Sequence, residues 1–252
     1  MKILSVGNSF SQDAHRWLHH IAGLSGVSME TVNLYIGGCT LTQHMDNYER
    51  DAADYDLEIN GGEAVRKISI SEALDMDSWD IITLQQASPH SGMPQTYLPA
   101  LPELADMIRT RCPGAQLWFH QIWAYEWGFE RPVFVPYNRD QNEMYRRQCD
   151  ATELAVKLTG APLIPSGRVI QYLRENVPEL DYRSGGLSLN RDGFHLSYDY
   201  GRFAAAATWL AVLGGKRVSP EAIASFEGLD AALLEKIADA VDNVLRESET
   251  LP

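Results

Sequence analysis

Short apolar runs alternate along this chain with longer stretches of helical spacing. The runs predict strands at Lys2–Val6, Met29–Ile36, Trp79–Leu84, Ala115–Ile122 and Pro162–Ile164. The helical spacing predicts helices at 99–111, 138–159, 166–175, 197–213 and 229–247, and an early helix that Ser11 caps and that ends at Gly26. Strands that alternate with helices form βαβ units with a parallel sheet. We therefore predict an α/β fold, a three-layer α/β/α sandwich around a mainly parallel sheet of about five strands.

Residues 40–78 depart from this alternation. Within them, YDLEINGGEAVRKISIS reads as two short strands around Asn60-Gly61-Gly62, which is typical of a hairpin turn. We expect this segment to be an excursion that covers one edge of a site. Since no linker-like change in composition or internal repeat follows, residues 1–252 are predicted to form a single domain.

Composition excludes some classes of partner. The formal net charge of −13 argues against nucleic acid and anionic membranes, because these demand clustered Lys and Arg. The three cysteines, Cys39, Cys112 and Cys149, are far apart and are expected to be free thiols. No apolar run is long enough to span a membrane and no secretory signal is visible. The prediction is a cytoplasmic protein, unless a leader has been removed.

The first strand ends abruptly in Gly7-Asn8-Ser9. Gly7 allows the backbone to turn sharply, and a small polar residue can then cap a helix. Ser9 is either a simple turn residue or a nucleophile at the carboxyl end of a strand. A serine nucleophile needs a base, an acid that orients the base, and donors for the oxyanion.

Asp192 and His195 offer the base and its partner. They precede a strongly apolar helix, and a three-residue spacing in a tight turn lets the carboxylate accept a hydrogen bond from the imidazole. The alternative is a helix cap beside a surface histidine. Among the other histidines, His15 and His19 form an i, i+4 pair that can bind a metal, and His90 follows a strand end as a candidate pocket residue.

The order of these blocks resembles that of the SGNH, or GDSL-like, hydrolase superfamily. Gly7-Asn8-Ser9 matches its Gly-Asp-Ser block, and Asp192 with His195 matches its Asp-x-x-His block. GNSFS and DGFHLS are most similar to a largely uncharacterised bacterial branch. The resemblance implies a flavodoxin-like fold, Ser9 as the nucleophile, and an oxyanion hole that includes the N–H groups of Ser9 and Gly38.

The third block of the superfamily contains an asparagine that this chain lacks. Gln85 and Gln86 end the corresponding strand, and a glutamine amide can donate as asparagine does. We assign the oxyanion role to Gln86, with Gln85 as its competitor.

The resemblance implies a serine esterase. The aromatic loop after residue 122 suggests that it releases small acyl groups, above all acetyl, from a carbohydrate; the alternative is a lid that packs on its own core. Flat rings beside polar groups suit sugars, so Trp123 and Tyr125 join Gln85 and His90 as candidate substrate-binding residues. No cofactor or metal is expected, and the expected partner is a small-molecule or glycan ester. The sequence leaves the oligomeric state open. The alternatives are a catalytically silent carbohydrate-binding protein and a metal-dependent hydrolase that uses His15, His19 or His90.

Overall fold

A computed structural model describes residues 1–249 and contains one seven-stranded sheet in the order β4-β3-β2-β1-β5-β6-β7. Its strands are β1 (Lys2–Gly7), β2 (Glu30–Tyr35), β3 (Tyr55–Ile59), β4 (Ala64–Ile68), β5 (Ile81–Leu84), β6 (Gln116–His120) and β7 (Leu163–Ile164). The run β2-β1-β5-β6-β7 is parallel, whereas β3 pairs antiparallel with β2, and β4 antiparallel with β3. The α/β class is confirmed, but the expected count of about five strands is wrong.

The two additional strands come from the predicted hairpin. β3 pairs with the free edge of β2, with Val32 opposite Ile59, and β4 becomes the new outer strand. β4 is mostly exposed and carries Arg66 and Lys67, as expected for an edge strand that must not pair further. The hairpin therefore extends the sheet, and the rest of the 40–78 segment forms two helices, α3 (Leu41–Glu49) and α4 (Ile70–Asp75).

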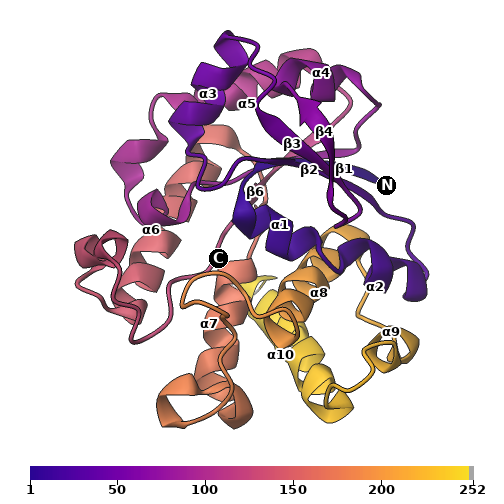
Figure 1. The fold of residues 1–252 in the computed structure, drawn as a ribbon, viewed down its shortest axis with the longest axis vertical. Coiled ribbons are helices and arrows are strands. Elements are labelled where there is room, and N and C mark those ends of the chain that lie inside the picture. The colour runs from indigo at the N-terminus through magenta and orange to yellow at the C-terminus, as the bar shows by residue number, and fades with distance from the viewer. Residues whose placement is uncertain (250–252) are drawn as a thin grey trace.

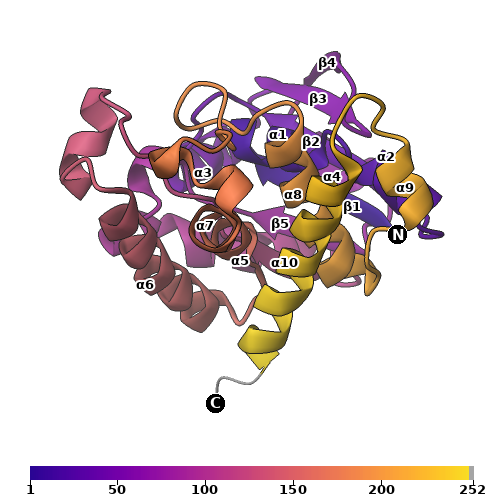
Figure 2. The ribbon, with the colours of Figure 1, turned by 90° about the horizontal axis from the view of Figure 1, so that it is seen from below.

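Helices cover both faces of the sheet (Figures 1 and 2). One face carries α1 (Ser9–His15), α2 (Leu18–Leu24), α7 (Ser166–Asn176), α8 (Tyr200–Gly214) and α10 (Ala231–Glu249), with the short α9 (Pro220–Ala224) beside α2. The other carries α3, α4, α5 (Ala100–Arg111) and α6 (Gln141–Thr159). Short 3₁₀ turns lie at Ser88–His90, Pro94–Tyr97, Pro132–Tyr137, Pro178–Leu180 and Tyr182–Ser184. Within residues 1–249, no helix has the length and apolar character that a membrane span requires.

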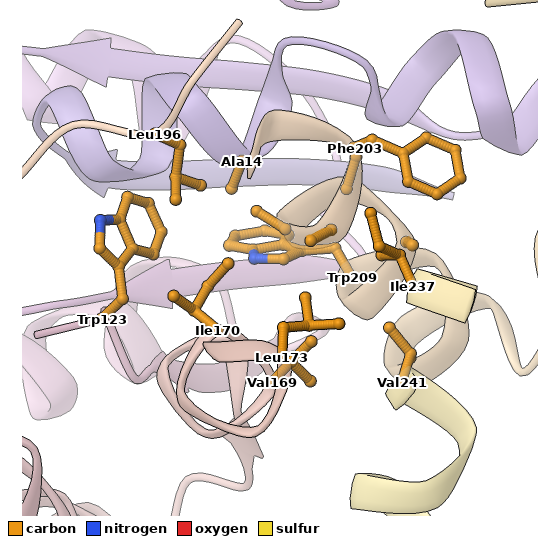
Figure 3. Packing of buried hydrophobic residues seen from close by; sticks show 14 of the residues in the cluster. Ala14, Trp123, Val169, Ile170, Leu173, Leu196, Phe203, Trp209, Ile237 and Val241 are labelled. Atoms are coloured by element: carbon orange, nitrogen blue, oxygen red, sulfur yellow. The ribbon is translucent and has the colours of Figure 1, made fainter. Parts of the chain in front are cut away.

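The core follows from the alternation of side chains along the strands. On β1, Ile3 faces the cluster under α1, α7, α8 and α10, and Leu4 faces the cluster under α3 to α6. Figure 3 shows the first cluster, with Trp209 of α8 at its centre and Trp123 and Leu196 at one end. Since Leu196 follows His195 directly and is fully buried, the core anchors the loop that carries this histidine.

The early helix differs from its prediction. It begins at Ser9, is capped by Asn8 rather than Ser11, and breaks between His15 and Leu18 into α1 and α2. Gly7 is needed for space rather than for an unusual backbone angle: a Cβ there would lie 2.1 Å from the Ser11 hydroxyl. The Ser11 hydroxyl lies in this space because it accepts a hydrogen bond from the Asn8 N–H, which completes the cap.

Candidate active site

Ser9 lies where β1 gives way to α1, at the carboxyl edge of the parallel strands. The Asn8 side chain holds this turn: its carbonyl accepts from the Phe10 N–H at 3.0 Å and its amide donates to the Cys39 carbonyl at 3.1 Å. Ser9 is the first residue of the helix, so its N–H has no intrahelical acceptor, and the Asn8 side chain caps the Phe10 N–H and not that of Ser9. The turn therefore presents both the hydroxyl and the amide of Ser9.

His195 lies on a tight loop closed by an antiparallel bridge between Asn190 and Leu196. The carboxylate of Asp192 accepts from the N–H groups of Phe194 (3.2 Å) and His195 (2.8 Å), which folds the three-residue spacing into a turn. Gly193 at its tip has a φ of +85°, and a Cβ there would lie 2.5 Å from Phe129. Glycine is required at this position for both reasons.

The structure brings Ser9, His195 and Asp192 into one chain of hydrogen bonds. His195 Nε2 lies 2.9 Å from Ser9 Oγ, and His195 Nδ1 lies 2.7 Å from Asp192 Oδ2. Partial burial opposes ionisation of Asp192, but the hydrogen bonds from the ring and backbone of His195 hold its pKa below the ordinary value. This carboxylate therefore stays ionised at neutral pH, which is the state that orients an imidazole base.

A second carboxylate, Asp13, joins the two segments that carry these residues. It lies one helical turn after Ser9 on α1, is fully buried, and accepts from the Leu196 N–H at 2.9 Å. It also pairs with Arg191 Nη1 at 2.9 Å and Arg202 Nε at 2.8 Å. Sequence reasoning missed Asp13, because its only signal is its spacing from Ser9 and its partners lie far along the chain.

A cavity of about 310 Å³ opens beside Ser9 and His195. Its walls are mostly aromatic or small, and they include Asn8, Phe10, Tyr35, Gly37, Gly38, Ser88, Pro89, Tyr125, Phe129, Arg131, Val133 and Phe194. Arg131 lies over the Phe194 ring at 5.3 Å and is the cationic group of the wall.

Besides Ser9 and His195, two further predicted residues line this cavity, Gly38 and Tyr125. Gly38 does so in the turn after β2, as expected of a backbone donor to an oxyanion. The N–H of Gly38 has no acceptor within residues 1–249. Tyr125 also lines the cavity, and its hydroxyl donates to Ser88 Oγ at 2.9 Å. Burial raises the pKa of Tyr125 to about 12, so the phenol stays a neutral donor.

The two glutamines do not line the cavity, and the geometry does not support the oxyanion role expected of Gln86. The Gln86 amide donates to Thr96, and its carbonyl accepts from the Leu41 and Ala87 N–H groups. Every polar atom of this buried side chain is therefore already occupied in bracing the loop.

Gln85 lies behind Asn8 rather than against the cavity. It donates to Asn8 Oδ1 at 2.7 Å and bonds to His120 Nδ1 at 2.6 Å, which in turn places His120 Nε2 3.0 Å from Ser166 Oγ. Gln85 thus orients the capping side chain and is not positioned to contact substrate.

The remaining candidates also lie outside the cavity wall. Trp123 is fully buried; it packs against Phe10 with the rings tilted and 4.6 Å between their centres, and it donates to the Phe194 carbonyl at 2.7 Å. It supports the wall from behind. His90 is half-buried in a 3₁₀ turn and is not part of the wall.

The predicted histidine pair does not converge on one point. His15 is buried, with Nε2 2.9 Å from Ser5 Oγ, whereas His19 is exposed and bonds to the Met29 carbonyl. Within residues 1–249, no three His, Cys, Asp or Glu side chains gather in a way that could hold a metal ion. The arrangement thus favours the serine hypothesis over a metal site at this pair.

Ser88 is a cavity residue that sequence reasoning did not assign. Its hydroxyl accepts from Tyr125 and keeps its own hydrogen for another acceptor. It lies two residues beyond Gln86, on the loop that follows β5. The sequence block therefore pointed to a loop that lines the cavity, although the side chain assigned from it, Gln86, does not line the cavity.

Comparison with known proteins places this geometry in a family. A family model described as "Domain of unknown function (DUF4886)" matches residues 2–227. A solved DUF4886 family protein from Bacteroides uniformis is 34% identical and superposes with a TM-score of 0.88, over 100% of this chain and 97% of its own. A search of curated proteins finds no match.

More distant solved structures share the fold. A putative SGNH hydrolase from Slackia heliotrinireducens is 22% identical, with a TM-score of 0.59 over 85% of this chain and 99% of its own. An acetyl xylan esterase from Geobacillus stearothermophilus is 13% identical, with a TM-score of 0.51 over 84% of this chain and 94% of its own. The fold is that of the SGNH superfamily, as the sequence blocks predicted, and the chain belongs to the DUF4886 family.

Proposed function

We propose that this protein is a serine esterase that hydrolyses small acyl esters. The single observation that carries the proposal is the hydrogen-bonded series Ser9–His195–Asp192, with 2.9 Å and 2.7 Å between the bonded atoms. The series lies at the carboxyl end of a parallel sheet, beside a cavity of about 310 Å³. This combination supplies a nucleophile, a base, an orienting acid and a place for the substrate.

In this reaction, His195 Nε2 takes the Ser9 proton as Ser9 Oγ attacks the ester carbonyl carbon. The tetrahedral oxyanion accepts hydrogen bonds from the N–H groups of Ser9 and Gly38. The Ser88 hydroxyl is the third donor, in place of the superfamily's asparagine. When the C–O bond of the ester breaks, the leaving alkoxide takes the proton from His195 and departs as an alcohol.

Water completes the cycle. His195 removes a proton from a water molecule, whose oxygen attacks the acyl group held on Ser9. The bond to Ser9 Oγ then breaks, the hydroxyl recovers the proton from His195, and the carboxylic acid leaves. Asp192 stabilises the imidazolium in both halves of the reaction, and the ring keeps its orientation through the 2.7 Å hydrogen bond.

The size and lining of the cavity favour a short acyl group, with acetyl as the first candidate. The aromatic wall suits an apolar acyl chain or the face of a sugar ring, and Arg131 can orient a polar alcohol portion. Similarity in fold to an acetyl xylan esterase supports an acetylated carbohydrate as the substrate class.

Hydrolysis of 4-nitrophenyl acetate by the native protein and by Ser9→Ala tests the proposal. Loss of Ser9 or His195 is expected to lower kcat by at least about three orders of magnitude, since the nucleophile and base act as a unit. Asp192→Asn is expected to cost less, because the backbone hydrogen bonds to this side chain can persist.

Thermal unfolding of each variant serves as the control for folding. Equal activity of the native protein and Ser9→Ala would contradict the proposal. A native protein that binds sugars but hydrolyses no ester would also contradict it. Loss of native activity on treatment with EDTA would favour a metal-dependent hydrolase instead.

A further inference from the structure

A second cavity, of about 200 Å³, lies on the other side of the loop that forms the wall of the first. The two cavities have no lining residue in common. Tyr125 and Phe129 face the cavity of Ser9, whereas Glu126 and Trp127 between them line the second cavity. The Glu126 N–H also donates to the Gly193 carbonyl at 2.8 Å, which ties this loop to the tip of the His195 loop.

The floor of the second cavity contains two buried charges of opposite sign. Glu126 is 5% exposed, and Ser188 Oγ is the one side-chain donor to its carboxylate within residues 1–249. Arg174 is 6% exposed and donates to the Ala124 carbonyl and to Asn190 Oδ1. A guanidinium has five N–H donors, and Nε of Arg174 has no partner. Both groups therefore retain hydrogen-bonding capacity that the protein does not use.

Two exposed aromatic rings lie at the rim of the same cavity. The side chains of Trp127 and Tyr182 are 52% and 45% exposed, which is unusual for residues that normally bury their rings. Gln141, Asn142 and Gln171 also line the cavity; the first and last are buried and Asn142 is exposed. Flat apolar surfaces over a floor of mixed donors and acceptors match the two kinds of surface of a sugar ring.

The charges select among classes of ligand. Three carboxylates line the cavity, those of Glu126, Glu175 and Asp181, together with the guanidinium groups of Arg174 and Arg183. Because both signs of charge are present, the lining favours neither a simple anion nor a simple cation. A hydroxyl group both donates and accepts, so a neutral polyhydroxylated ligand can satisfy a carboxylate and a guanidinium at once.

We propose that this second cavity binds a neutral sugar unit and so holds the carbohydrate part of an oligosaccharide substrate. That the sugar belongs to a substrate rests on the proposed function, which this inference deepens. Binding of the sugar itself does not depend on hydrolysis. In this proposal, the rings of Trp127 and Tyr182 stack on the sugar ring. The side chains of Glu126 and Arg174 form hydrogen bonds with the sugar hydroxyl groups.

Isothermal titration calorimetry with oligosaccharides that carry no ester tests the site separately from catalysis. The probes are xylotetraose, cellotetraose and mannotetraose, with tetragalacturonate as an anionic comparison, added to native protein and to Ser9→Ala. We expect at least one neutral probe to bind both proteins equally, with a Kd on the order of 1 mM. Trp127→Ala and Glu126→Gln are each expected to weaken this binding by at least about tenfold.

The matched control is Tyr198→Ala, which removes an aromatic ring that is 63% exposed and belongs to neither cavity. It is expected to leave the Kd unchanged. Absence of binding by every neutral probe would overturn the proposal, as would tighter binding of tetragalacturonate or binding that both cavity variants retain in full. Binding by a protein that has no esterase activity would support the site and reject the proposed function.

Discussion

At the residue scale, Asn8 determines how Ser9 is presented. Its carbonyl accepts from both the Phe10 N–H and the Gln85 amide, and its own amide donates to Cys39. Both the oxygen and the nitrogen of the Asn8 side-chain amide therefore have partners. One of these partners, Gln85, directly follows β5. The capping residue leaves the Ser9 N–H free for an oxyanion, which explains why a cap and a nucleophile can occupy neighbouring positions.

Ser88 and Gln86 give a direct test at this scale, because they lie on the same loop and only Ser88 lines the cavity. Ser88→Ala is expected to lower kcat for 4-nitrophenyl acetate by about tenfold to a hundredfold, since it removes one donor to the oxyanion. Gln86→Ala is expected to lower the free energy of unfolding by about 1–3 kcal/mol, because it leaves two buried N–H groups unpaired, with little change in kcat. Steady-state kinetics and urea unfolding of both variants check the pair, and the reverse pattern would restore Gln86 to the oxyanion role.

At the element scale, the site depends on how α1 meets the loop of residues 190–196. Ser9 and Asp13 lie one turn apart on α1, and Asp13 accepts from the Leu196 N–H directly after His195. The helix that carries Ser9, the proposed nucleophile, thus also holds the segment that carries His195, the proposed base. Asp13 acts through other groups and is a positioning residue.

Asp13→Asn keeps the shape of this contact and removes the charge that faces two arginines. We expect kcat for 4-nitrophenyl acetate to fall by about tenfold to a hundredfold at nearly constant KM, because a small displacement of the base is costly in rate. Stability is also expected to fall, because Arg191 and Arg202 lose a buried partner. Asp80→Asn, at an exposed carboxylate, is the control. If the folded variant retained the native kcat, Asp13 would be a structural residue alone.

At the scale of the whole molecule, three buried histidines make stability depend on pH. Burial lowers the pKa of His15, His44 and His120 to about 3 in each case, with repulsion from His15 contributing at His120. The unfolded chain binds these protons near pH 6.5, so below that pH it holds more protons than the folded state. The stability that neutral histidines contribute is complete above pH 6.5 and is lost as the pH falls toward 3.

Between about pH 6.5 and 3, each histidine adds about 1.4 kcal/mol per pH unit to the change of the free energy of unfolding with pH. The raised pKa values of Glu58 and Glu126, both caused by burial, act in the opposite direction, so the net slope is smaller than the sum. Urea unfolding at pH 7, 6 and 5 is expected to show a midpoint that decreases as the pH is lowered, and more between pH 6 and 5 than between pH 7 and 6. A midpoint that stays constant over this range would contradict the burial of neutral histidines.

Local signals account for much of what the sequence predicted. The parallel strands and the main helices follow from periodicity, and the turn of Asp192 and His195 follows from a spacing that a single Asx-type turn can close. The predicted start of the early helix was wrong because Asn8 and Ser11 are both good capping residues. Only their reciprocal hydrogen bonds select Asn8 as the cap. Such local choices depend on a few neighbouring residues.

The sequence by itself determined the α/β alternation, the end of β1 just before Ser9 and the turn that joins Asp192 to His195, because each depends on residues a few positions apart. Only the tertiary structure decided that the 55–68 hairpin adds two strands to the sheet, that Gln86 turns away from the cavity, and that Asp13 joins α1 to the His195 loop. Each of these depends on a partner brought close by packing, and a side-chain amide or carboxylate bonds to whichever group packing places within reach.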